Sequence, residues 1–343
     1  MARIAVAMSG GVDSTVTARL LAREGHEVCG LFMALAQPDL DQQVARVEEV
    51  ADRLGVELKV VDLSQEFQRH VLDYFARSYF QGRTPNPCVV CNPMVKCGQL
   101  LAAAEKLGCE ALATGHYVRI QKSASAYQLL KGKDAGKDQS YFLCGLQQEQ
   151  LARLRFPLGE LHKEEVYGLA EEFGFTDFRG QESQDVCFLK ECSVQDFLAD
   201  YGPETPRPGE IVDRQGTILG QHQGIHRYTI GQRRGLGIPA PQPLYVVGLD
   251  AKKNLVIVGS DQDLWGKSLT VSQFNWLAAK EPALPKVFTV KIRYRHQGAE
   301  AWLEKSDAGY RLFFSEPQRA ITPGQFAVLY DGEELVGGGE IDS

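Results

Sequence analysis

The N-terminal segment constrains the fold more than any other part of the chain. An apolar run, Ile4 to Ala7, leads into Ser9-Gly10-Gly11-Val12-Asp13-Ser14, and apolar residues at helical spacing follow from Thr15 to Arg23. This order predicts a strand, a tight turn and a helix. The glycines allow backbone conformations that a Cβ forbids, so that N–H groups can converge on an anion at the helix N-terminus. The segment therefore predicts a phosphate-binding loop.

Two common phosphate-binding loops do not match this segment. It has no lysine after the glycines, as in a Walker A loop, and no third glycine, as in a dinucleotide-binding fingerprint. The alternative is an ordinary strand-to-helix turn in which Asp13 or Ser14 caps the helix. We prefer the nucleotide interpretation because glycines, serines and an acid are so densely arranged.

Strand-like and helix-like segments alternate through the rest of the first half. The predicted strands cover 28–33, 58–61 and 111–114, and the predicted helices cover 44–54, 65–80, 96–107 and 163–173. Such alternation is typical of an α/β fold with a doubly wound parallel sheet and a ligand site at the carboxyl ends of its strands. The phosphate-binding loop, Met33 and Thr114-Gly115-His116 all fall on that edge.

Two predicted loops carry cysteines. Prolines at 85, 87 and 93 exclude regular structure and predict a stiff, extended loop with Cys88 and Cys91. A second predicted loop, 181–188, presents Cys187. Both loops are expected to face the nucleotide edge of the sheet.

The second half of the chain changes character. A break rich in proline and glycine spans 201–209, and short alternating runs after it predict antiparallel β-structure. A weaker break lies at 259–266. We therefore expect a catalytic α/β domain over 1–200, a small β-rich domain over 201–262 and a β-barrel-like domain over 263–343.

Bulk properties limit the class of protein. The 343 residues carry a formal charge of −7, so any nucleic-acid partner must be held by a local basic region. We find no signal peptide and no apolar run of membrane-spanning length, which predicts a soluble, cytoplasmic protein without a membrane partner. Eight cysteines in such a chain indicate thiol chemistry or a metal rather than a disulfide framework.

Several motifs in a fixed order resemble one family along almost the whole chain. They are Ser9 to Ser14, Pro87 to Asn92, Thr114 to Tyr117, Lys137 to Phe142, Phe156 to Gly159, Ser183 to Phe188 and Gly224 to Gly237. The chain resembles the tRNA-specific 2-thiouridylases (MnmA/TrmU type), which belong to the N-type ATP pyrophosphatases.

The resemblance implies that O2 of the wobble uridine in certain tRNA anticodons is replaced by sulfur. ATP, with Mg²⁺, would adenylate that oxygen, and a sulfur nucleophile would attack the activated carbon. The implied ATP contacts are Ala7, Met8, Ser9, Gly10, Gly11, Val12, Asp13, Ser14, Met33 and Gly115. The implied tRNA contacts are Asn86, Pro87 and Cys88 at the target base, and His116, Lys137, Asp138, Gln139, Arg293, Tyr294 and Gln325 elsewhere. Asp13 either positions Mg²⁺ or favours the helix start by its charge.

The resemblance also assigns the sulfur chemistry. In the family, the cysteine matching Cys91 is the nucleophile, and the one matching Cys187 carries a persulfide from a donor protein. This sequence departs from better-known members at Cys88, where they have an acidic residue. Cys88, Cys91 and Cys187 offer three thiolates, enough to hold a 4Fe-4S cluster whose open iron binds sulfide. We slightly prefer the cluster, and a persulfide relay through Cys187 and Cys91 stays open as the alternative. Zinc is a weaker option because no fourth ligand has suitable spacing.

Two basic groups are candidates for tRNA binding. The run 286–296 contains Lys286, Lys291, Arg293, Arg295 and His296 and no acid. If this run forms a strand, Lys291, Arg293 and Arg295 share one face of it. The second group consists of Arg227, Arg233 and Arg234 in a glycine-rich loop. Both groups suit phosphates rather than base edges.

Two other functions compete with tRNA thiolation. Another ATP pyrophosphatase, one that adenylates a small metabolite, would need neither the basic β domain nor the paired cysteines. A non-enzymatic RNA-binding module would retain tRNA without forming AMP, which the intact Ser9, Asp13 and Ser14 argue against. Pyrophosphate release that depends on added tRNA distinguishes these functions.

Overall fold

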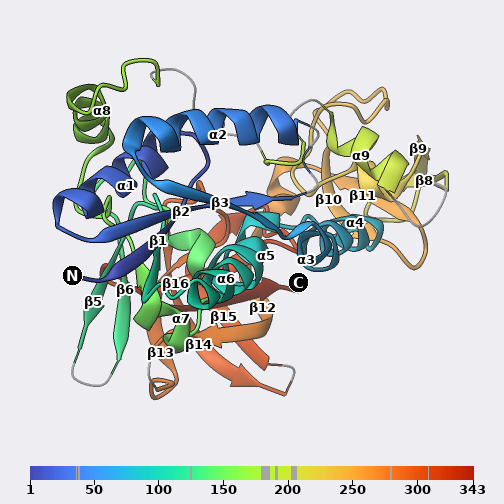
Figure 1. The fold of residues 1–343 in the computed structure, drawn as a ribbon. Helices are drawn as coiled ribbons and strands as arrows, with labels where there is room; N and C mark the ends of the chain where they lie inside the picture. Colours follow the sequence, from blue (N-terminus) through green and yellow to red (C-terminus); the bar gives the residue numbers. More distant parts are fainter. Residues whose placement is uncertain are drawn as a thin grey trace.

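The structure is a computed structural model in which three sheets organise the described residues (Figure 1). Those residues are 1–35, 37, 39–123, 126–178, 186–189, 192–201, 207–278, 280–307 and 309–343. The predicted loop positions 181–185 and the centre of the predicted break, 202–206, lie outside them. The predicted domain boundaries at 201 and 263 remain predictions.

The first sheet is parallel and has the strand order β3-β2-β1-β4-β7. Its strands are β1 (Arg3–Ala7), β2 (Glu27–Ala34), β3 (Glu57–Asp62), β4 (Ala111–Ala113) and β7 (Leu154–Arg155). The first four cover the strands that apolar runs predict, and the parallel α/β architecture is confirmed. Since β1 is central, the turn after it opens in the middle of the carboxyl edge.

Helices cover both faces of this sheet, and each face has its own apolar core (Figure 1). One face carries α1 (Val12–Arg23), α2 (Leu40–Leu54) and α8 (Lys163–Glu172). The other carries α3 (Ser64–Phe67), η1 (Gln68–Leu72), α4 (Asp73–Phe80), α5 (Pro87–Cys91), η2 (Asn92–Gln99), α6 (Leu100–Lys106), η3 (Ser140–Leu143), α7 (Gln148–Arg153) and α9 (Val194–Tyr201). The sheet is therefore doubly wound, as predicted.

The segment with Cys88 and Cys91 is helical, so the prediction of an extended loop is wrong. Pro87 is the first residue of α5, a position where proline is tolerated because its missing N–H would have no partner inside the helix. Pro93 lies in η2, a π-helical stretch that continues α5 without a break. Pro87 thus starts this helix, and the π-helical stretch accommodates Pro93.

A closed antiparallel barrel forms the C-terminal part. Its strand order is β12-β15-β14-β13-β16-β17, and pairing of β12 with β17 closes it. The strands are β12 (Trp265–Trp276), β13 (Lys286–Lys291), β14 (Ala299–Ser306), β15 (Gly309–Arg319), β16 (Phe326–Asp331) and β17 (Glu334–Ile341). Alternate side chains, such as Phe288, Val290 and Leu312, fill the interior. The barrel-like β domain is confirmed.

A hairpin from the N-terminal part extends the sheet of the barrel. Its strands are β5 (Val118–Lys122) and β6 (Tyr127–Lys131). β6 pairs antiparallel with β17, where Leu129 lies opposite Leu335. The sequence analysis did not predict this hairpin. It joins the α/β part and the barrel by backbone hydrogen bonds.

The small middle sheet has the order β10-β11-β8-β9. Its strands are β8 (Gly209–Val212), β9 (Ile218–His222), β10 (Tyr245–Asp250) and β11 (Leu255–Gly259), with short helices η4 (Ile225–Arg227) and η5 (Asp261–Leu264) beside it. β11 and β8 run parallel, so the expectation of a purely antiparallel sheet is wrong there.

Within the described residues no helix is long and apolar enough to cross a bilayer.

Candidate active site

The glycine-rich turn lies between β1 and α1 at the carboxyl edge of the parallel sheet. Gly10 has a φ of +71°, a conformation that favours glycine. The backbone N–H of Ser9 donates to Ser14 Oγ at 3.2 Å, and Ser14 Oγ donates to the carbonyl of Gly11 at 3.1 Å. These bonds fold the turn onto the first turn of α1. The strand–turn–helix geometry is the one that the sequence predicts.

Asp13 is the one ionisable side chain in the segment from Met8 to Thr15. Its Oδ1 accepts hydrogen bonds from the Tyr117 hydroxyl at 2.8 Å and from Lys163 Nζ at 2.7 Å. Gly115 lies directly against it, because a Cβ at this glycine would come within 2.7 Å of Asp13 Cβ. The loop after β4 and the start of α8 therefore fix the Asp13 carboxylate.

Cys88 and Cys91 lie three residues apart on α5, and therefore on one side of the helix. Asn86 caps this helix, since its Oδ1 accepts the N–H of Val89 at 3.4 Å. The side chain of Asn92 donates to the carbonyl of Cys88 at 3.0 Å and to that of Phe142 at 3.3 Å. These contacts fix the orientation of both cysteines against the rest of the protein.

The two cysteines of α5, Cys187 and Lys96 lie in one neighbourhood. Burial raises the pKa of the Cys91 thiol to about 12, while the charge of Lys96 acts against this increase. Burial also raises the pKa of Cys88, and Cys187 adds to that effect. Cys187 therefore lies close enough to influence the pKa values of both thiols of α5, although it is remote from them in sequence. Cys91 is a protonated thiol at neutral pH.

The residue after Cys187 anchors its segment. Cys187 is exposed, whereas Phe188 is buried in an aromatic cluster. The ring of Phe188 packs edge-on against Phe75 at 5.1 Å and Phe67 at 5.8 Å, and tilted against Phe197 at 5.2 Å. The rings come from α4, α3 and α9, so three helices hold the segment and leave the thiol at the surface.

His116 connects the phosphate-binding loop with the cysteines. It follows Gly115, which touches Asp13, and burial together with the charge of Lys96 keeps its pKa well below the usual value. Its Nδ1 lies 2.6 Å from Thr114 Oγ1. The charge of Lys96 therefore acts on both His116 and Cys91, and the imidazole is neutral at neutral pH.

Cys88, Cys91 and Cys187 are the predicted metal ligands. Among the described residues, no three His, Cys, Asp or Glu side chains are close enough together to hold a metal ion. Cys88, Cys91 and Cys187, as placed here, do not form the three-cysteine site that a 4Fe-4S cluster requires.

Asp138, predicted to contact tRNA, is buried and makes internal hydrogen bonds. Its Oδ1 accepts the N–H groups of Gly132 and Ser140, both at 3.1 Å, and its Oδ2 accepts Ser140 Oγ at 3.0 Å. Lys291 of the barrel lies 3.7 Å from the same oxygen. This carboxylate links the two parts of the molecule. The neighbouring Gln139 accepts the N–H of Tyr117 at 3.0 Å.

Two predicted tRNA contacts from the C-terminal part, Tyr294 and Gln325, touch the α/β part. Tyr294 packs on Phe142 with ring centroids 4.4 Å apart. Gln325 donates from its side chain to the carbonyl of Thr84 at 2.8 Å. Arg83 bridges from the same segment to Glu340 and Asp342, both at less than 3 Å. The barrel thus holds the chain just before α5.

The basic run of the barrel is not a continuous strand. β13 ends at Lys291, and Arg293 and Arg295 lie in the turn that leads back to β14. The prediction that these arginines share a strand face with Lys291 is wrong, because β13 has lost both neighbouring strands by residue 292. Both arginines are exposed, and the side chain of Arg293 donates to the carbonyl of Arg319 at 3.1 Å.

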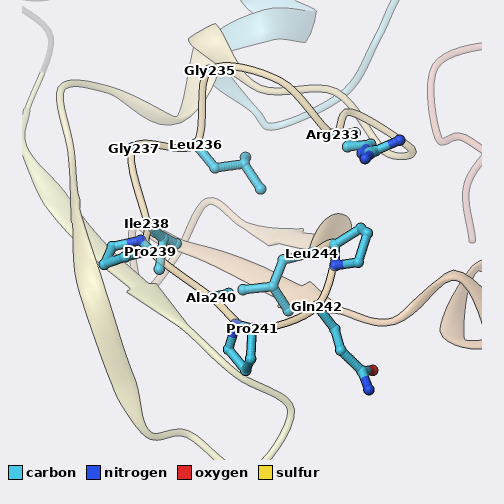
Figure 2. A pocket seen from close by; sticks show the side chains of 11 residues that line it. Arg233, Gly235, Leu236, Gly237, Ile238, Pro239, Ala240, Pro241, Gln242 and Leu244 are labelled. Atoms are coloured by element: carbon cyan, nitrogen blue, oxygen red, sulfur yellow. The ribbon is translucent and has the colours of Figure 1, made fainter.

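Arg227, Arg233 and Arg234, the second basic group, are exposed. Arg233 alone among them lines a cavity of about 610 Å³ in the middle domain. Figure 2 shows the loop from Arg233 to Leu244 around it, with the side chains of Leu236 and Leu244 toward its centre. None of the predicted catalytic residues lines this cavity.

Sequence reasoning missed several residues of the site. Lys163 lies 150 positions after Asp13, and no local pattern relates the two. Lys96 follows Cys91 by five positions, a spacing that does not place two residues on one side of a regular α-helix, so sequence reasoning did not relate them. Phe188 had no predicted role beyond being the last residue of the motif Ser183 to Phe188.

Comparisons with known proteins cover nearly the whole chain. Three family models match consecutive parts: a tRNA methyl transferase HUP domain at residues 2–191, a tRNA methyl transferase PRC-barrel domain at 195–260 and an aminomethyltransferase beta-barrel domain at 266–341.

Curated relatives match at full length. The chain is 50% identical over 337 residues to the tRNA-specific 2-thiouridylase MnmA of Desulfotalea psychrophila, covering 98% of each chain. It is 46% identical to the protein of that name from Geobacter metallireducens, over 99% of this chain and 97% of the relative. The relative of the same name from Nostoc punctiforme is 43% identical, over 100% of this chain and 99% of the relative. A 4-thiouridine synthetase–RNA complex with bound ATP is similar at 18% identity over 59% of this chain and 50% of that chain, but its TM-score of 0.35 supports no conclusion.

Proposed function

The chain belongs to the tRNA-specific 2-thiouridylase family, and we propose that it replaces O2 of the wobble uridine in tRNA anticodons by sulfur. ATP activates the oxygen by adenylation, and AMP then leaves when sulfur attacks C2. Since tRNA is the proposed substrate, we propose that the protein acts in the cytoplasm.

One observation carries the proposal: a chain of neighbouring residues connects the phosphate-binding loop to the Cys91 thiol. Asp13 of the loop touches Gly115, His116 follows, and Lys96 acts electrostatically on both His116 and Cys91. A nucleotide whose terminal phosphates lie on the loop would extend along this edge toward the sulfur. This supports a reaction in which adenylation and sulfur attack occur at one bound uridine.

ATP and Mg²⁺ fit the residues at the loop. Backbone N–H groups of the glycine turn and the hydroxyls of Ser9 and Ser14 are donors suited to phosphate oxygens. Mg²⁺ is commonly held by one or two carboxylates together with substrate phosphates, and Asp13 supplies a carboxylate there. When bound, the ion would offset the charge of the leaving pyrophosphate.

We assign the sulfur to a persulfide relay, since the cysteines as placed do not form a cluster site. A donor protein leaves a persulfide on the exposed Cys187, and its outer sulfur forms a bond to C2 of the adenylated uridine as AMP departs. The Cys91 thiolate then attacks Cys187 Sγ, which breaks the bond to the outer sulfur and releases 2-thiouridine. The resulting Cys91–Cys187 disulfide must be reduced by an external dithiol before the next cycle.

The tRNA is proposed to lie across the barrel and the α5 segment. Exposed Arg293 and Arg295 suit backbone phosphates. Tyr294 packs on Phe142 of η3, and Gln325 donates to Thr84, just before α5. Charge reversal at both arginines should weaken tRNA binding and reduce its salt dependence, with ATP binding unchanged. An unchanged salt slope would remove this turn from the interface.

The test of the function is thiolation in a defined mixture. Purified protein is incubated with ATP, Mg²⁺, a persulfide donor, a dithiol reductant and transcript tRNA, and nucleosides are analysed for 2-thiouridine. We expect product from the wild type, loss of product with Cys91→Ala or Cys187→Ala, and product with Cys192→Ala, a matched control on an exposed cysteine. Pyrophosphate release independent of tRNA would instead favour a metabolite-adenylating enzyme.

A second measurement separates the two sulfur routes. The protein is assayed once iron-free and once after anaerobic reconstitution with iron and sulfide. Equal 2-thiouridine formation from persulfide by the iron-free protein supports the relay. A strict requirement for iron, with visible absorbance of a cluster, would overturn it.

A further inference from the structure

The phosphate-binding loop contains no cation, yet it must hold a polyanion. Its one charged side chain is the carboxylate of Asp13, which would repel the phosphates of a nucleotide. Backbone N–H groups and the helix dipole contribute only partial charges. Besides the Mg²⁺ that accompanies ATP, a positive charge from elsewhere in the chain would therefore favour binding of a polyanion at a loop of this composition.

Lys163, the first residue of α8, supplies a charge at this position. Its Nζ lies 2.7 Å from Asp13 Oδ1, and only 7% of its side chain is exposed, compared with 34% for Asp13. A buried ammonium group is costly unless it is paired, so this contact is not incidental surface pairing.

The surroundings of Lys163 hold it in place. Its Nζ lies over the rings of Tyr117 at 5.6 Å and Tyr167 at 5.0 Å, where the faces of the rings attract a cation. Its backbone N–H donates to Asp134 Oδ2 at 3.0 Å, which fixes the start of the helix. The Tyr117 hydroxyl donates to the same oxygen of Asp13 as the lysine does.

We propose that Lys163 is the cation of the phosphate-binding loop: a positioning residue that neutralises and orients Asp13, so that the loop accepts the phosphates of ATP. The lysine acts through the carboxylate, from its buried side. The proposal rests on the proposed function insofar as the loop must bind ATP. It assigns to α8 a part in the nucleotide site.

The test measures ATP binding by calorimetry in the absence of tRNA and sulfur donor. Lys163→Met keeps the apolar stem between the tyrosines and removes the charge, and we expect ATP to bind at least about tenfold more weakly. Lys163→Arg keeps the charge and should recover most of the affinity. Lys133→Met, which removes an exposed lysine, is the matched control and should bind as the wild type does.

A second variant separates neutralisation of Asp13 from direct contact with phosphate. Adding Asp13→Asn to Lys163→Met removes the carboxylate that the lysine neutralises, so affinity should return to within about threefold of Asp13→Asn alone. If the double variant stays at least about tenfold weaker than Asp13→Asn, the lysine contacts phosphate directly and the positioning role is overturned. This comparison holds even if Lys163→Met alone does not fold.

Other outcomes also decide the proposal. A folded Lys163→Met protein that binds ATP like the wild type overturns it. A wild type that binds no ATP overturns it together with the proposed function. If the variants behave as expected but the wild type makes no 2-thiouridine, the role of Lys163 stands and the proposed function fails.

Discussion

The half-buried thiol of Cys91 should react slowly and with a distinctive pH dependence. With a pKa of about 12, about one molecule in 10⁴ carries the thiolate at pH 8. A free cysteine with a pKa of about 8.5 is then about one quarter thiolate. The deficit of about 2,000-fold is partly offset because a more basic thiolate is about 40-fold more nucleophilic toward disulfides. We therefore expect Cys91 to react about 50-fold more slowly than free cysteine.

The assay follows exchange with a small aromatic disulfide between pH 7 and pH 10, with peptide mass spectrometry to assign each modified cysteine. Since the pKa lies above this range, the rate at Cys91 should rise about tenfold per pH unit without a plateau. Lys96→Met removes the charge that opposes the increase in pKa, so the rate should fall further. Arg155→Met, which removes an exposed charge at the end of β7, should leave the rate unchanged.

A plateau in the rate at Cys91 near pH 8 to 9 would refute this reasoning, because it would show an ordinary thiol. A rate independent of pH would also refute it, since slow opening of the site would then limit the reaction. Acceleration at Cys91 on adding tRNA and an ATP analogue would show that substrates activate the thiol, as the proposed relay requires.

Three other changes test how the site is held. Phe188→Ala removes a buried ring and should cost about 3–5 kcal/mol of stability and lower thiolation more than ATP binding, which activity and calorimetry compare. Arg83→Met removes the charge that opposes the increase in the pKa of the buried Glu340 carboxyl. A carboxyl whose pKa is raised in the folded state contributes stability that is present below its unfolded pKa and is lost as pH rises through its folded pKa. Chemical denaturation should therefore show a larger loss of stability at pH 8 than at pH 5. Gly115→Ala pushes a methyl group against the loop and should weaken ATP binding while tRNA binding persists, as paired titrations would show.

Local patterns correctly predicted the strand, turn and helix that form the glycine-rich loop. The strand, glycine turn and helix around Gly10 depend on residues adjacent in sequence, and the structure contains them where the pattern indicates. The helix at Cys88 was not predicted because proline was interpreted as a breaker, although Pro87 occupies the first helical position, where its ring and missing N–H are tolerated.

Long-range contacts account for the other differences. Lys163 and Asp13 meet because α8 packs beside α1, and nothing in either segment encodes the partner. The strand over residues 293–295 was predicted from alternation alone, but a strand also needs neighbours to pair with, and β13 has none beyond Lys291. The hairpin β5–β6 was missed because its partner strand, β17, lies about 200 residues later in the chain.

The pairing of β6 with β17 has a practical consequence for dividing this protein. A fragment that stops at residue 200 would lose the strand opposite Leu129 and leave a bare apolar edge, which is prone to aggregate. The barrel expressed alone would likewise lack a neighbour for Leu335. Fragments for binding studies should therefore be co-expressed, or the hairpin should be retained on the barrel by a designed connection.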